Sequence, residues 1–498
     1  MSAARPSSLI VTDPIRSNVL GSVPNLSREA VLAAADRARL AQRAWAASPV
    51  RARAGVLQRF ADALVQRQDL LIDVIRQESG KSYSGALNEV GILVVTADYY
   101  ARHAPRWLRP AKRRGFAPLA YGVRVHRKPY GLVGAITPWN FPLMLALVDA
   151  LPALVAGNAV LLKPSEVAPF SALEGRRLLV ECGLPEDALQ VLTGDAVTGE
   201  ALVDAVDYVM FTGSEAVGRR VAVRAAERLI PCSLELGGSD AMIVLREADL
   251  DKAAAAAIRG GFENAGQVCI GTERIFVEAE AYPRFIRKLK KWHGRLRVGP
   301  ERSLDVHMGS MTHLPTLQRT EAQIADALHK GGKLLVGGQR LPELGQLFFA
   351  PTIITDATPE MHALQSETFG PLITVMSVPD AETAVRLANS IPLGLSASVW
   401  SRNLNRAQAV AQQLETGDVN INSVLMTFGM PAMEQGGVKQ SGLGRRNGQQ
   451  GLLKYTYTQS VLVEHIHPPT AVTVSTRFFK RFFLGYRWLS RRLPFLGS

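Results

Sequence analysis

The chain has 498 residues, 47% of them apolar and 20% charged, which is typical of globular proteins and long enough for two to four domains. Scattered glycine and proline exclude collagen-like and disordered classes. Three cysteines without a CxxC pair exclude a disulfide framework and a zinc ribbon, and we expect no metal site. The net charge is +13, but six basic residues and no acidic residue lie in the last 22 positions, so the excess does not predict nucleic-acid binding by the body.

The first hundred residues predict helices. Ser27 can cap a helix that runs to residue 47, and apolar residues spaced by three and four predict a second helix over 50–78. The N-terminus has no apolar run long enough for a signal peptide, and no stretch of about 18 apolar residues occurs anywhere. We therefore expect a cytoplasmic protein.

From about residue 120, short β-rich runs alternate with helical patterns, which predicts parallel sheets covered by helices and hence the α/β class. Two series of such runs indicate two domains with a break near residues 235–240. The strands are expected within 131–139, 157–164 and 206–213 for the first series, and within 240–245, 331–338, 371–378 and 420–424 for the second.

Two further segments, 121–131 and 455–466, alternate apolar and polar residues over strand length. We expect them to pair as antiparallel arms in a small third lobe that mediates association between subunits. The assembly predicted in this way is a homodimer or a homotetramer.

The C-terminal residues can form an amphipathic helix. Placed at 100° per residue, its aromatic and leucine side chains fall in one arc opposite the basic ones, interrupted only by Leu484 and Trp488. Such a helix can lie in a membrane surface, which would make the protein peripheral at the inner face of a membrane. The alternative is a helix packed on its own dimer. The arc contains Phe478, Phe479, Phe482, Phe483, Tyr486, Leu489 and Leu493.

Glycines at a strand-to-helix turn give the first candidate site. Phe211-Thr212-Gly213-Ser214 ends a β run, and Gly218 follows in the helical pattern. Bare backbone at such a turn lets a pyrophosphate approach a helix N-terminus. The alternative is a tight turn without a ligand. A second phosphate motif is rejected, because residues 80–82 resemble the end of a P-loop but position 75 is isoleucine.

Three polar residues are candidates for chemistry. Cys269 follows a Gly-Gln pair that can form a sharp turn, although a free cysteine is more often a small buried hydrophobe. Glu235 lies between two leucines and before two glycines, where burial would raise its pKa as a general base requires, or where helix amides could satisfy it. Asn140, between aromatic residues and prolines, suits an oxyanion donor or an Asx turn.

Together these residues resemble the aldehyde dehydrogenase superfamily over about residues 20–465. The resemblance implies an α/β fold with a Rossmann-like NAD-binding domain (1–118 and 132–237), an α/β catalytic domain (238–440), an oligomerisation arm (119–131 and 450–467) and a basic tail (468–498). The motifs, in family order, are TPWN (137–140), KPSE (163–166), FTGS (211–214) with Gly218, ELGG (235–238), GQVC (266–269), ETFGP (367–371) and GGVKQSGLGR (436–445).

The resemblance implies a mechanism. Cys269 would attack an aldehyde, Asn140 and the Cys269 backbone N–H would hold the oxyanion, hydride would pass to a nicotinamide, and Glu235 would activate the water that hydrolyses the thioester. The glutamate favours a free carboxylic acid as product. A different class remains open, namely a thioester-forming acyltransferase or esterase that works without a cofactor.

The cofactor residues are carried over from the same resemblance. Glu166 would bind ribose hydroxyls and repel a 2′-phosphate, so NAD is the expected cofactor and NADP the second candidate. The implied set is Thr137, Pro138, Trp139, Lys163, Ser165, Glu166, Gly213, Ser214, Gly218, Leu236, Gly237, Glu367 and Phe369.

Two positions depart from the family pattern. Asp149 stands where relatives commonly have lysine, and Arg446 where they commonly have glutamate. Because either charge alone would be costly in a partly buried place, we expect the two side chains to face each other as a swapped pair.

The aldehyde itself is indicated by the residues around the nucleophile. Segments 150–158 and 444–460 look like a bacterial subgroup often labelled succinate-semialdehyde dehydrogenase, but Val148 stands where well-studied enzymes for that substrate have arginine. A carboxylate needs a cationic partner, so we expect an apolar aliphatic or aromatic aldehyde, with succinate semialdehyde as the alternative. The expected tunnel residues are Met144, Leu145, Val148, Val268 and Ile270.

Overall fold

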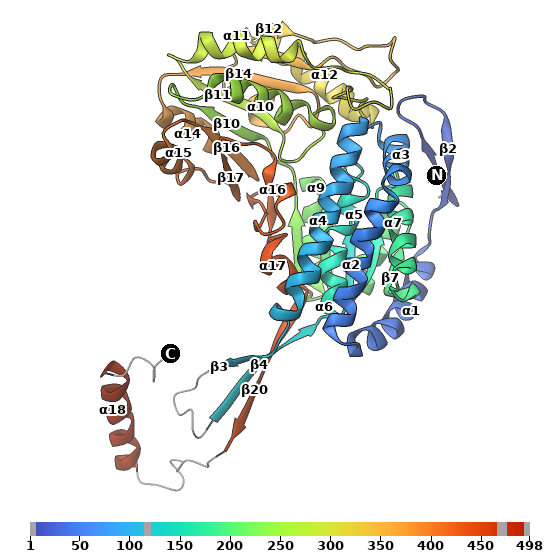
Figure 1. Cartoon of the computed structure of the whole chain (residues 1–498), viewed down its shortest axis with the longest axis vertical. Coiled ribbons are helices and arrows are strands. Elements are labelled where there is room, and N and C mark those ends of the chain that lie inside the picture. Colours follow the sequence, from blue (N-terminus) through green and yellow to red (C-terminus); the bar gives the residue numbers. More distant parts are fainter. Residues whose placement is uncertain (1–5, 114–120, 466–475, 493–498) are drawn as a thin grey trace.

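The computed structural model describes residues 6–113, 121–465 and 476–492, and it confirms the predicted α/β class. The chain builds two large sheets, each covered by helices, and a narrow arm that projects from them (Figure 1). Within the described ranges, no helix is both long and apolar enough to cross a bilayer.

A six-stranded sheet forms the first layer system. Its strands are parallel except for the short β19, and successive side chains alternate between the two faces. Leu132 and Leu161 point to a core shared with α1, α8 and α9, whereas Val133 and Val160 point to a core shared with α2, α4, α6 and α7. The strand order is β19 (Gly442–Leu443), β9 (Cys232–Glu235), β8 (Tyr208–Thr212), β5 (Leu132–Ile136), β6 (Ala159–Lys163) and β7 (Leu189–Val191).

Helices cover both faces of this sheet. Ser27 caps α1 as expected, since its side chain accepts a hydrogen bond from the Ala30 amide. The single helix predicted over 50–78 is wrong, because it breaks at Arg67 into two. The helices are α1 (Arg28–Ala47), α2 (Val50–Gln66), α3 (Gln68–Ser79), α4 (Tyr83–Trp107), α5 (Met144–Leu147), α6 (Ala150–Ala156), α7 (Phe170–Glu181), α8 (Ala196–Ala205) and α9 (Glu215–Glu227), with a 3₁₀ turn at Glu186–Ala188.

The prediction that the first hundred residues are helical is wrong near the N-terminus. β1 (Ser8–Thr12) and β2 (Val19–Pro24) form an antiparallel hairpin there. The connecting residues 13–18 contain a tight turn in which the Asp13 side chain accepts hydrogen bonds from the amides of Ile15 and Arg16.

A seven-stranded sheet forms the second layer system, and the chain enters it between Glu235 and Asp240. One large buried cluster joins this sheet to its helices. The strand order is β12 (Lys333–Val336), β13 (Thr352–Thr355), β14 (Leu372–Val378), β11 (Thr272–Glu278), β10 (Asp240–Val244), β16 (Ser396–Trp400) and β17 (Asp418–Ile421), with only β12 antiparallel to its neighbour. Between β9 and β20 the chain forms the helices α10 (Leu250–Phe262), α11 (Tyr282–His293), α12 (Leu314–His329), α13 (His362–Gln365), α14 (Ala381–Asn389), α15 (Leu404–Ala411), α16 (Met426–Gly429) and α17 (Gly448–Leu453). In the same part of the chain, β15 (Leu393–Gly394) pairs with β18 (Val438–Lys439).

The two predicted arm segments pair as expected. β4 (Tyr121–Pro129) lies antiparallel to β20 (Thr456–Glu464) along its whole length. β3 (Ala111–Arg113) adds a third strand, so these residues belong to the arm and not to the first domain as predicted. Residues 450–453 lie in α17, and its Leu452 is buried in the body, so the arm begins later than residue 450.

The predicted C-terminal helix is present as α18 (Thr476–Arg492), and Figure 1 places it away from the two large sheets. Its apolar side chains are about half exposed at Phe478, Phe482 and Trp488. Leu493 and the ends of the predicted arm segments at 119–120 and 466–467 lie outside the described residues.

Candidate active site

Many of the expected cofactor residues lie at one edge of the six-stranded sheet. Thr137 follows β5, Lys163 ends β6 and Gly213 follows β8. These strands are parallel neighbours, so their carboxyl ends meet at the same edge. Ligands of open α/β sheets bind in the crevice outside this edge, at a place where the strand order reverses.

Several polar side chains gather at this edge of the sheet. The Lys163 ammonium lies 3.2 Å from a carboxylate oxygen of Glu166, whose side chain is half exposed. The hydroxyl oxygen of Thr137 is buried and has no hydrogen-bond partner. The Ser165 hydroxyl accepts a bond from the Val167 amide and so fixes the turn that carries Glu166. These donors and acceptors suit a sugar with two hydroxyl groups.

Helix α9 supplies an N-terminus beside them. Ser214 is its N-cap residue, but its side chain caps none of the helix amides, so the amides of the first turn remain available to an anion. A Cβ at Gly218 would lie 2.5 Å from a Leu236 methyl carbon, so glycine is needed for the helix to pack against Leu236. Gly218 and Leu236, both expected cofactor residues, therefore pack together and fix the position of the helix.

A second group of expected cofactor residues comes from the ETFGP loop. The Glu367 carboxylate accepts a bond from the Gly238 amide, and a Cβ at Gly237 would lie 2.4 Å from it. The Phe369 ring meets the Trp139 ring edge-on at 5.7 Å between centroids, with Pro138 next to it in the chain. The contact between Trp139 and Phe369 thus joins the two groups of expected cofactor residues.

A sharp turn precedes Cys269, but it includes Asn264 and Ala265 before Gly266 and so begins earlier than the predicted Gly-Gln pair. Asn264 and Ala265 have φ of 50° and 54°, within a short 3₁₀ segment at Glu263–Gly266. Left-handed conformations at two residues other than glycine store backbone strain and cluster at functional sites. A Cβ at Gly238 would lie 2.5 Å from the Cys269 carbonyl oxygen, so the backbone of the first sheet's exit loop touches that of the cysteine.

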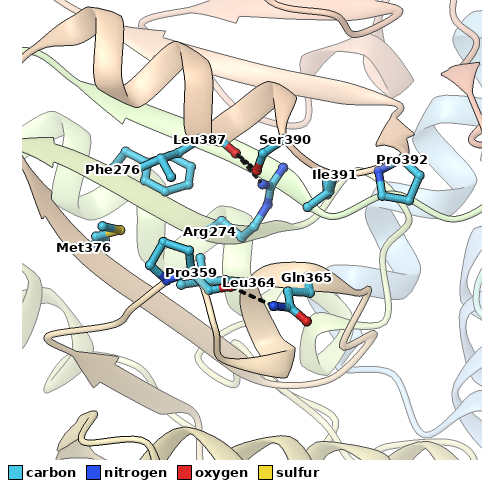
Figure 2. A pocket seen from close by; sticks show the side chains of 10 residues that line it. All are labelled: Arg274, Phe276, Pro359, Leu364, Gln365, Met376, Leu387, Ser390, Ile391 and Pro392. Atoms are coloured by element: carbon cyan, nitrogen blue, oxygen red, sulfur yellow. Dashed lines mark hydrogen bonds between the residues drawn. The ribbon is translucent and has the colours of Figure 1, made fainter.

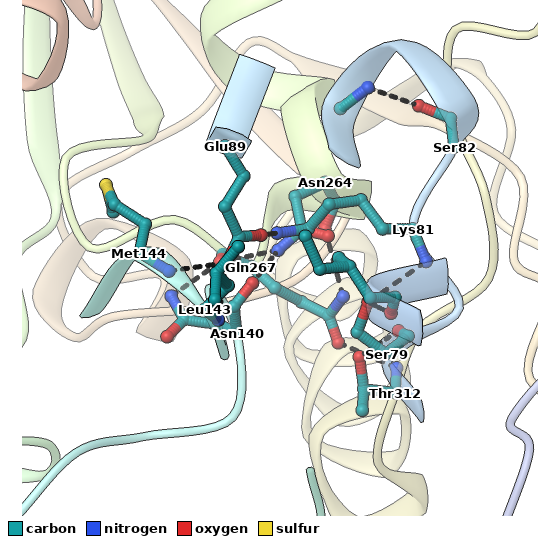
Figure 3. Close-up of polar contacts among 12 residues, drawn as sticks. Ser79, Lys81, Ser82, Glu89, Asn140, Leu143, Met144, Asn264, Gln267 and Thr312 are labelled. Carbon is teal, nitrogen blue, oxygen red and sulfur yellow. Dashed lines mark hydrogen bonds and ion pairs between the residues drawn. The ribbon is translucent and has the colours of Figure 1, made fainter. Parts of the chain in front are cut away.

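Asn140 is fastened to this turn by hydrogen bonds in both directions. Its side-chain nitrogen donates to the Gln267 carbonyl at 2.9 Å, and the Asn264 side chain donates to the Asn140 carbonyl at 2.9 Å (Figure 3). An amide has two N–H donors, so one of them remains for a ligand. Asn140 is 2% exposed, and its placement therefore suits an oxyanion donor.

A buried ion pair supports the Asn140 loop, and sequence reasoning missed it. The Lys81 ammonium lies 2.5 Å from Glu89 and 3.8 Å from the centroid of the Phe141 ring. The other Glu89 oxygen accepts bonds from the amides of Leu143 and Met144, where α5 begins. Figure 3 shows this pair beside Asn140 and Gln267. A signal was available, because Glu89 falls on the apolar face of α4.

Glu235 ends β9 and is 4% exposed. Burial raises its pKa to about 7, although the cations of Arg446 and Lys454 oppose the rise. A carboxyl group with this pKa can exchange protons near neutral pH, as a general base must. Burial also raises the pKa of the Cys269 thiol, with Arg446 as the opposing charge, so the resting thiol is protonated.

All five expected tunnel residues lie in one apolar cluster with the partly buried Cys269. The cluster is completed by Phe141 just before α5, by Leu395 and by Phe428 in α16. Its buried members are Phe141, Met144, Leu145, Val148, Val268, Ile270, Leu395 and Phe428.

The swapped pair forms as predicted. The Arg446 Nε lies 2.7 Å from Asp149 Oδ2, and both side chains are 3% exposed. Although burial alone would raise it, the cations of Arg446 and Lys454 hold the pKa of Asp149 below its usual value.

A separate cavity of about 260 Å³ lies within the second layer system (Figure 2). Arg274 reaches it from β11, and its guanidinium donates to backbone carbonyls of Ser239, Leu387 and Ala388. The bonds to Leu387 and Ala388 cap the end of α14. The residues that line the cavity include none of the expected site residues.

Comparison with known proteins decides the family. A family model described as the aldehyde dehydrogenase family matches residues 2–461. The chain belongs to this family. It is 40% identical, over 91% of its length and 89% of the other, to a protein of Mycolicibacterium smegmatis that carries the provisional name succinate-semialdehyde dehydrogenase [NADP(+)]. It is also 38% identical to the 4,4′-diapolycopene aldehyde oxidase of a Methylomonas species, with 93% and 87% of the two chains covered.

Solved structures agree on the fold of this aldehyde dehydrogenase. A succinate-semialdehyde dehydrogenase from Burkholderia pseudomallei superposes with a TM-score of 0.87 at 34% identity, covering 92% of this chain and 94% of the other. An NAD-dependent aldehyde dehydrogenase from Sinorhizobium meliloti gives 0.89 at 32% identity, with 93% of each chain covered.

Proposed function

We propose that this NAD(P)-dependent aldehyde dehydrogenase oxidises an apolar aldehyde to its carboxylic acid, with Cys269 as nucleophile, Glu235 as base and Asn140 as oxyanion donor. The observation that carries the proposal is the fastening of Asn140 to the Gln267 carbonyl, two residues before the cysteine. This bond holds the Asn140 amide to the backbone two residues from the cysteine in the chain, which supports its role as donor to the carbonyl oxygen that gains negative charge during attack.

The chain's own groups account for the proton transfers. Cys269 must lose its proton before attack, and Glu235, with a pKa of about 7, can accept it near neutral pH. The sulfur then bonds to the carbonyl carbon, and Asn140 donates to the oxygen that becomes negative. Glu235 must release that proton to solvent before hydrolysis. It then takes a proton from the water that cleaves the thioester and passes it to the leaving thiolate, which frees the acid and the thiol.

When bound, NAD(P) supplies the acceptor for the hydride. The residues that would hold it fit such a ligand: Thr137, Lys163 and Glu166 offer polar atoms for a ribose, and the first turn of α9 offers amides for a pyrophosphate. Glu367 lies close enough to Cys269 for its charge to raise the pKa of the thiol, and Phe369 lies two residues further along the same loop. The set of residues supports a dinucleotide in an extended conformation across the sheet edge.

We further propose that NAD is preferred to NADP. The half-exposed Glu166 carboxylate would repel a 2′-phosphate, although the provisional names of several relatives specify NADP(+). In a Glu166→Ser variant we expect the ratio of kcat/KM for NAD to that for NADP to fall at least tenfold, an order-of-magnitude figure for one charge contact. An unchanged ratio would refute the assignment.

The apolar cluster around Cys269 favours an apolar substrate. Lys81 contacts this cluster through the Phe141 ring, but it already pairs with Glu89 and so is not available to bind a substrate carboxylate. The Methylomonas relative is named for a hydrocarbon-like aldehyde, which agrees with this proposal. The second candidate is succinate semialdehyde, supported by the names of the mycobacterial relatives and the Burkholderia structure.

Absorbance at 340 nm tests the reaction, with NAD or NADP and an aldehyde panel that runs from succinate semialdehyde to long alkanals. We expect the highest kcat/KM for apolar members. Cys269→Ser should reduce turnover by at least about 10³-fold with dinucleotide binding intact. The matched controls are Cys182→Ser and Cys232→Ser, since those thiols lie outside the cluster and should leave turnover unchanged. Ester hydrolysis without any aldehyde oxidation would favour the cofactor-independent rival.

We also propose that α18 attaches the enzyme to an anionic membrane surface. The helix has exposed aromatic side chains, among them Trp488, and exposed basic ones, among them Arg481 and Arg491, with no acidic residue between Thr476 and Arg492. Cosedimentation with vesicles of anionic and of zwitterionic lipid tests the proposal. Binding to the anionic vesicles should be lost on deletion of residues 476–498, and binding that survives the deletion would refute it.

The arm supports the proposal of a homodimer or homotetramer. Val461, Leu462 and Val463 lie on β20, an edge strand of the three-stranded sheet, and each is at least 39% exposed. Consecutive exposed apolar residues on an edge strand are typical of a surface that pairs with another chain.

A further inference from the structure

A cluster of buried charges lies behind Glu235. Asp149, the N-cap residue of α6, accepts three hydrogen bonds: from Arg446 Nε at 2.7 Å, from Lys454 Nζ at 2.8 Å and from the Tyr455 hydroxyl at 2.7 Å. The Lys454 side chain is 11% exposed, and those of Asp149 and Arg446 are less exposed still. The cluster is therefore shielded from solvent, and its charges act strongly on their neighbours.

The guanidinium of Arg446 connects this cluster to the base. Its second contact is a bond from Nη2 to the hydroxyl of Thr212 at 2.8 Å. Thr212 ends β8 and is the register partner of Glu235 at the end of β9. The hydroxyl that Arg446 bonds therefore belongs to the residue beside Glu235 on the neighbouring strand, and the Arg446 charge acts on the Glu235 carboxyl.

The charges balance only when Glu235 is ionised. Arg446 and Lys454 bring two positive charges and Asp149 one negative charge, so a carboxylate at Glu235 makes the buried group neutral. A buried group with net charge is costly, and the cluster therefore favours the ionised base.

We infer that Arg446, oriented by Asp149, is a positioning residue whose fixed positive charge keeps Glu235 ionised for the hydrolysis step. This inference rests on the proposed function and deepens it, because it assigns to a particular ion pair the pH at which the base works. Arginine suits the role, since it keeps its charge at every pH at which the enzyme is active.

Several other charges face the two reacting groups. Around Glu235, Arg446 and Lys454 lower its pKa, whereas Asp149 and Asp418 raise it. Around Cys269, Arg446 lowers the pKa of the thiol, whereas Glu367, Glu235 and Asp240 raise it. Arg446 thus favours the ionised form of both groups.

The two halves of the ion pair should act in opposite directions. Loss of the Arg446 charge in Arg446→Met raises the pKa of Glu235, and the acid limb of the rate should move up by about one to two pH units. Asp149→Asn removes a negative charge but keeps an amide oxygen that can accept the bond from Arg446, so the limb should stay or move down. The downward shift is small, because Lys454 loses its partner carboxylate at the same time.

The experiment measures hydrolysis of a p-nitrophenyl ester between pH 5.5 and 9, since deacylation of Cys269 needs the base but no cofactor. The parent should show an acid limb near pH 7, in line with the raised pKa of Glu235. Arg446→Lys, which retains a charge beside Asp149, should keep the limb within about half a unit of the parent's. Arg402→Met, an exposed arginine paired with Asp249, controls for loss of one positive charge elsewhere.

The outcomes are distinguishable. Equal shifts in Arg446→Met and Asp149→Asn, or no shift in Arg446→Met, would overturn the inference while the proposed function stands. Parent-like turnover in Cys269→Ser would instead overturn the proposed function. Thermal melts and NADH binding identify a variant that has lost its fold, and the remaining variants then decide.

Discussion

The body of this enzyme and its arm and tail distribute apolar residues in opposite ways. In the body, alternate residues of each strand are buried on one face or the other, and even charges such as Lys81 and Glu89 are enclosed in pairs. In the arm and tail, side chains such as Leu462 and Trp488 are more than half exposed. The strands of the body therefore bury their apolar side chains in its own cores, whereas the arm and the tail leave apolar side chains exposed for contact with another molecule.

The largest expected effect tests the enclosed side of this comparison. Lys81→Met would leave the Glu89 carboxylate buried without its partner, which typically costs about 3–5 kcal/mol of unfolding free energy. Urea denaturation measures this loss. The double variant Lys81→Met, Glu89→Leu should recover part of it, because no charge is then unpaired.

A surface ion pair provides the matched control. Arg177 bonds to Glu174 and Glu181 on one exposed face of α7, and Arg177→Met should cost at most about 1 kcal/mol. If Lys81→Met and Arg177→Met lowered the free energy of unfolding by similar amounts, the buried pair would stabilise the fold no more than a surface pair does.

A smaller effect on the fold, but a clear one on assembly, is expected in the arm. Leu462→Asp sets a charge on an exposed strand that we expect a second copy of the chain to cover. Sedimentation velocity should show smaller species with an unchanged circular dichroism spectrum. Leu229→Asp serves as the control, since Leu229 is 93% exposed on the body and lies outside the arm. An unchanged assembly in Leu462→Asp would argue against the arm as the interface.

The smallest effect is expected from the tail. Deletion of residues 476–498 should change the unfolding free energy by less than about 0.5 kcal/mol, because substitutions and losses at exposed sites seldom cost more. The kcat with a short, water-soluble aldehyde should change less than about twofold. A large loss of stability would mean that α18 packs on the body or on a second subunit.

Local patterns were sufficient for much of the architecture. The alternation in 121–131 and 455–466 predicted two strands that pair, and the opposite charges at Asp149 and Arg446 predicted a contact across 297 positions of sequence. Each prediction uses a local pattern that requires one kind of environment. Alternating apolar and polar residues require a paired strand, and opposite charges in a buried place require an ion pair. The roles of the catalytic and cofactor residues came from motif order and stay predictions.

Features that depend on the assembled structure were missed. The β1–β2 hairpin has few residues and carries no strong alternation, and the helix break at Arg67 has no glycine or proline to mark it. Glu89 has a partner eight residues earlier, but its contacts with the amides of α5 depend on how α4 packs against that loop. Sequence spacing contains no information on such packing.

The contact between Gly238 and Cys269 has a consequence for natural variation. Any side chain at position 238 would meet the cysteine carbonyl at a distance that real structures do not show. A homologue with alanine or serine there must have shifted either this loop or the backbone at the cysteine. The residue at this position therefore indicates whether a homologue keeps the same approach of the two backbones.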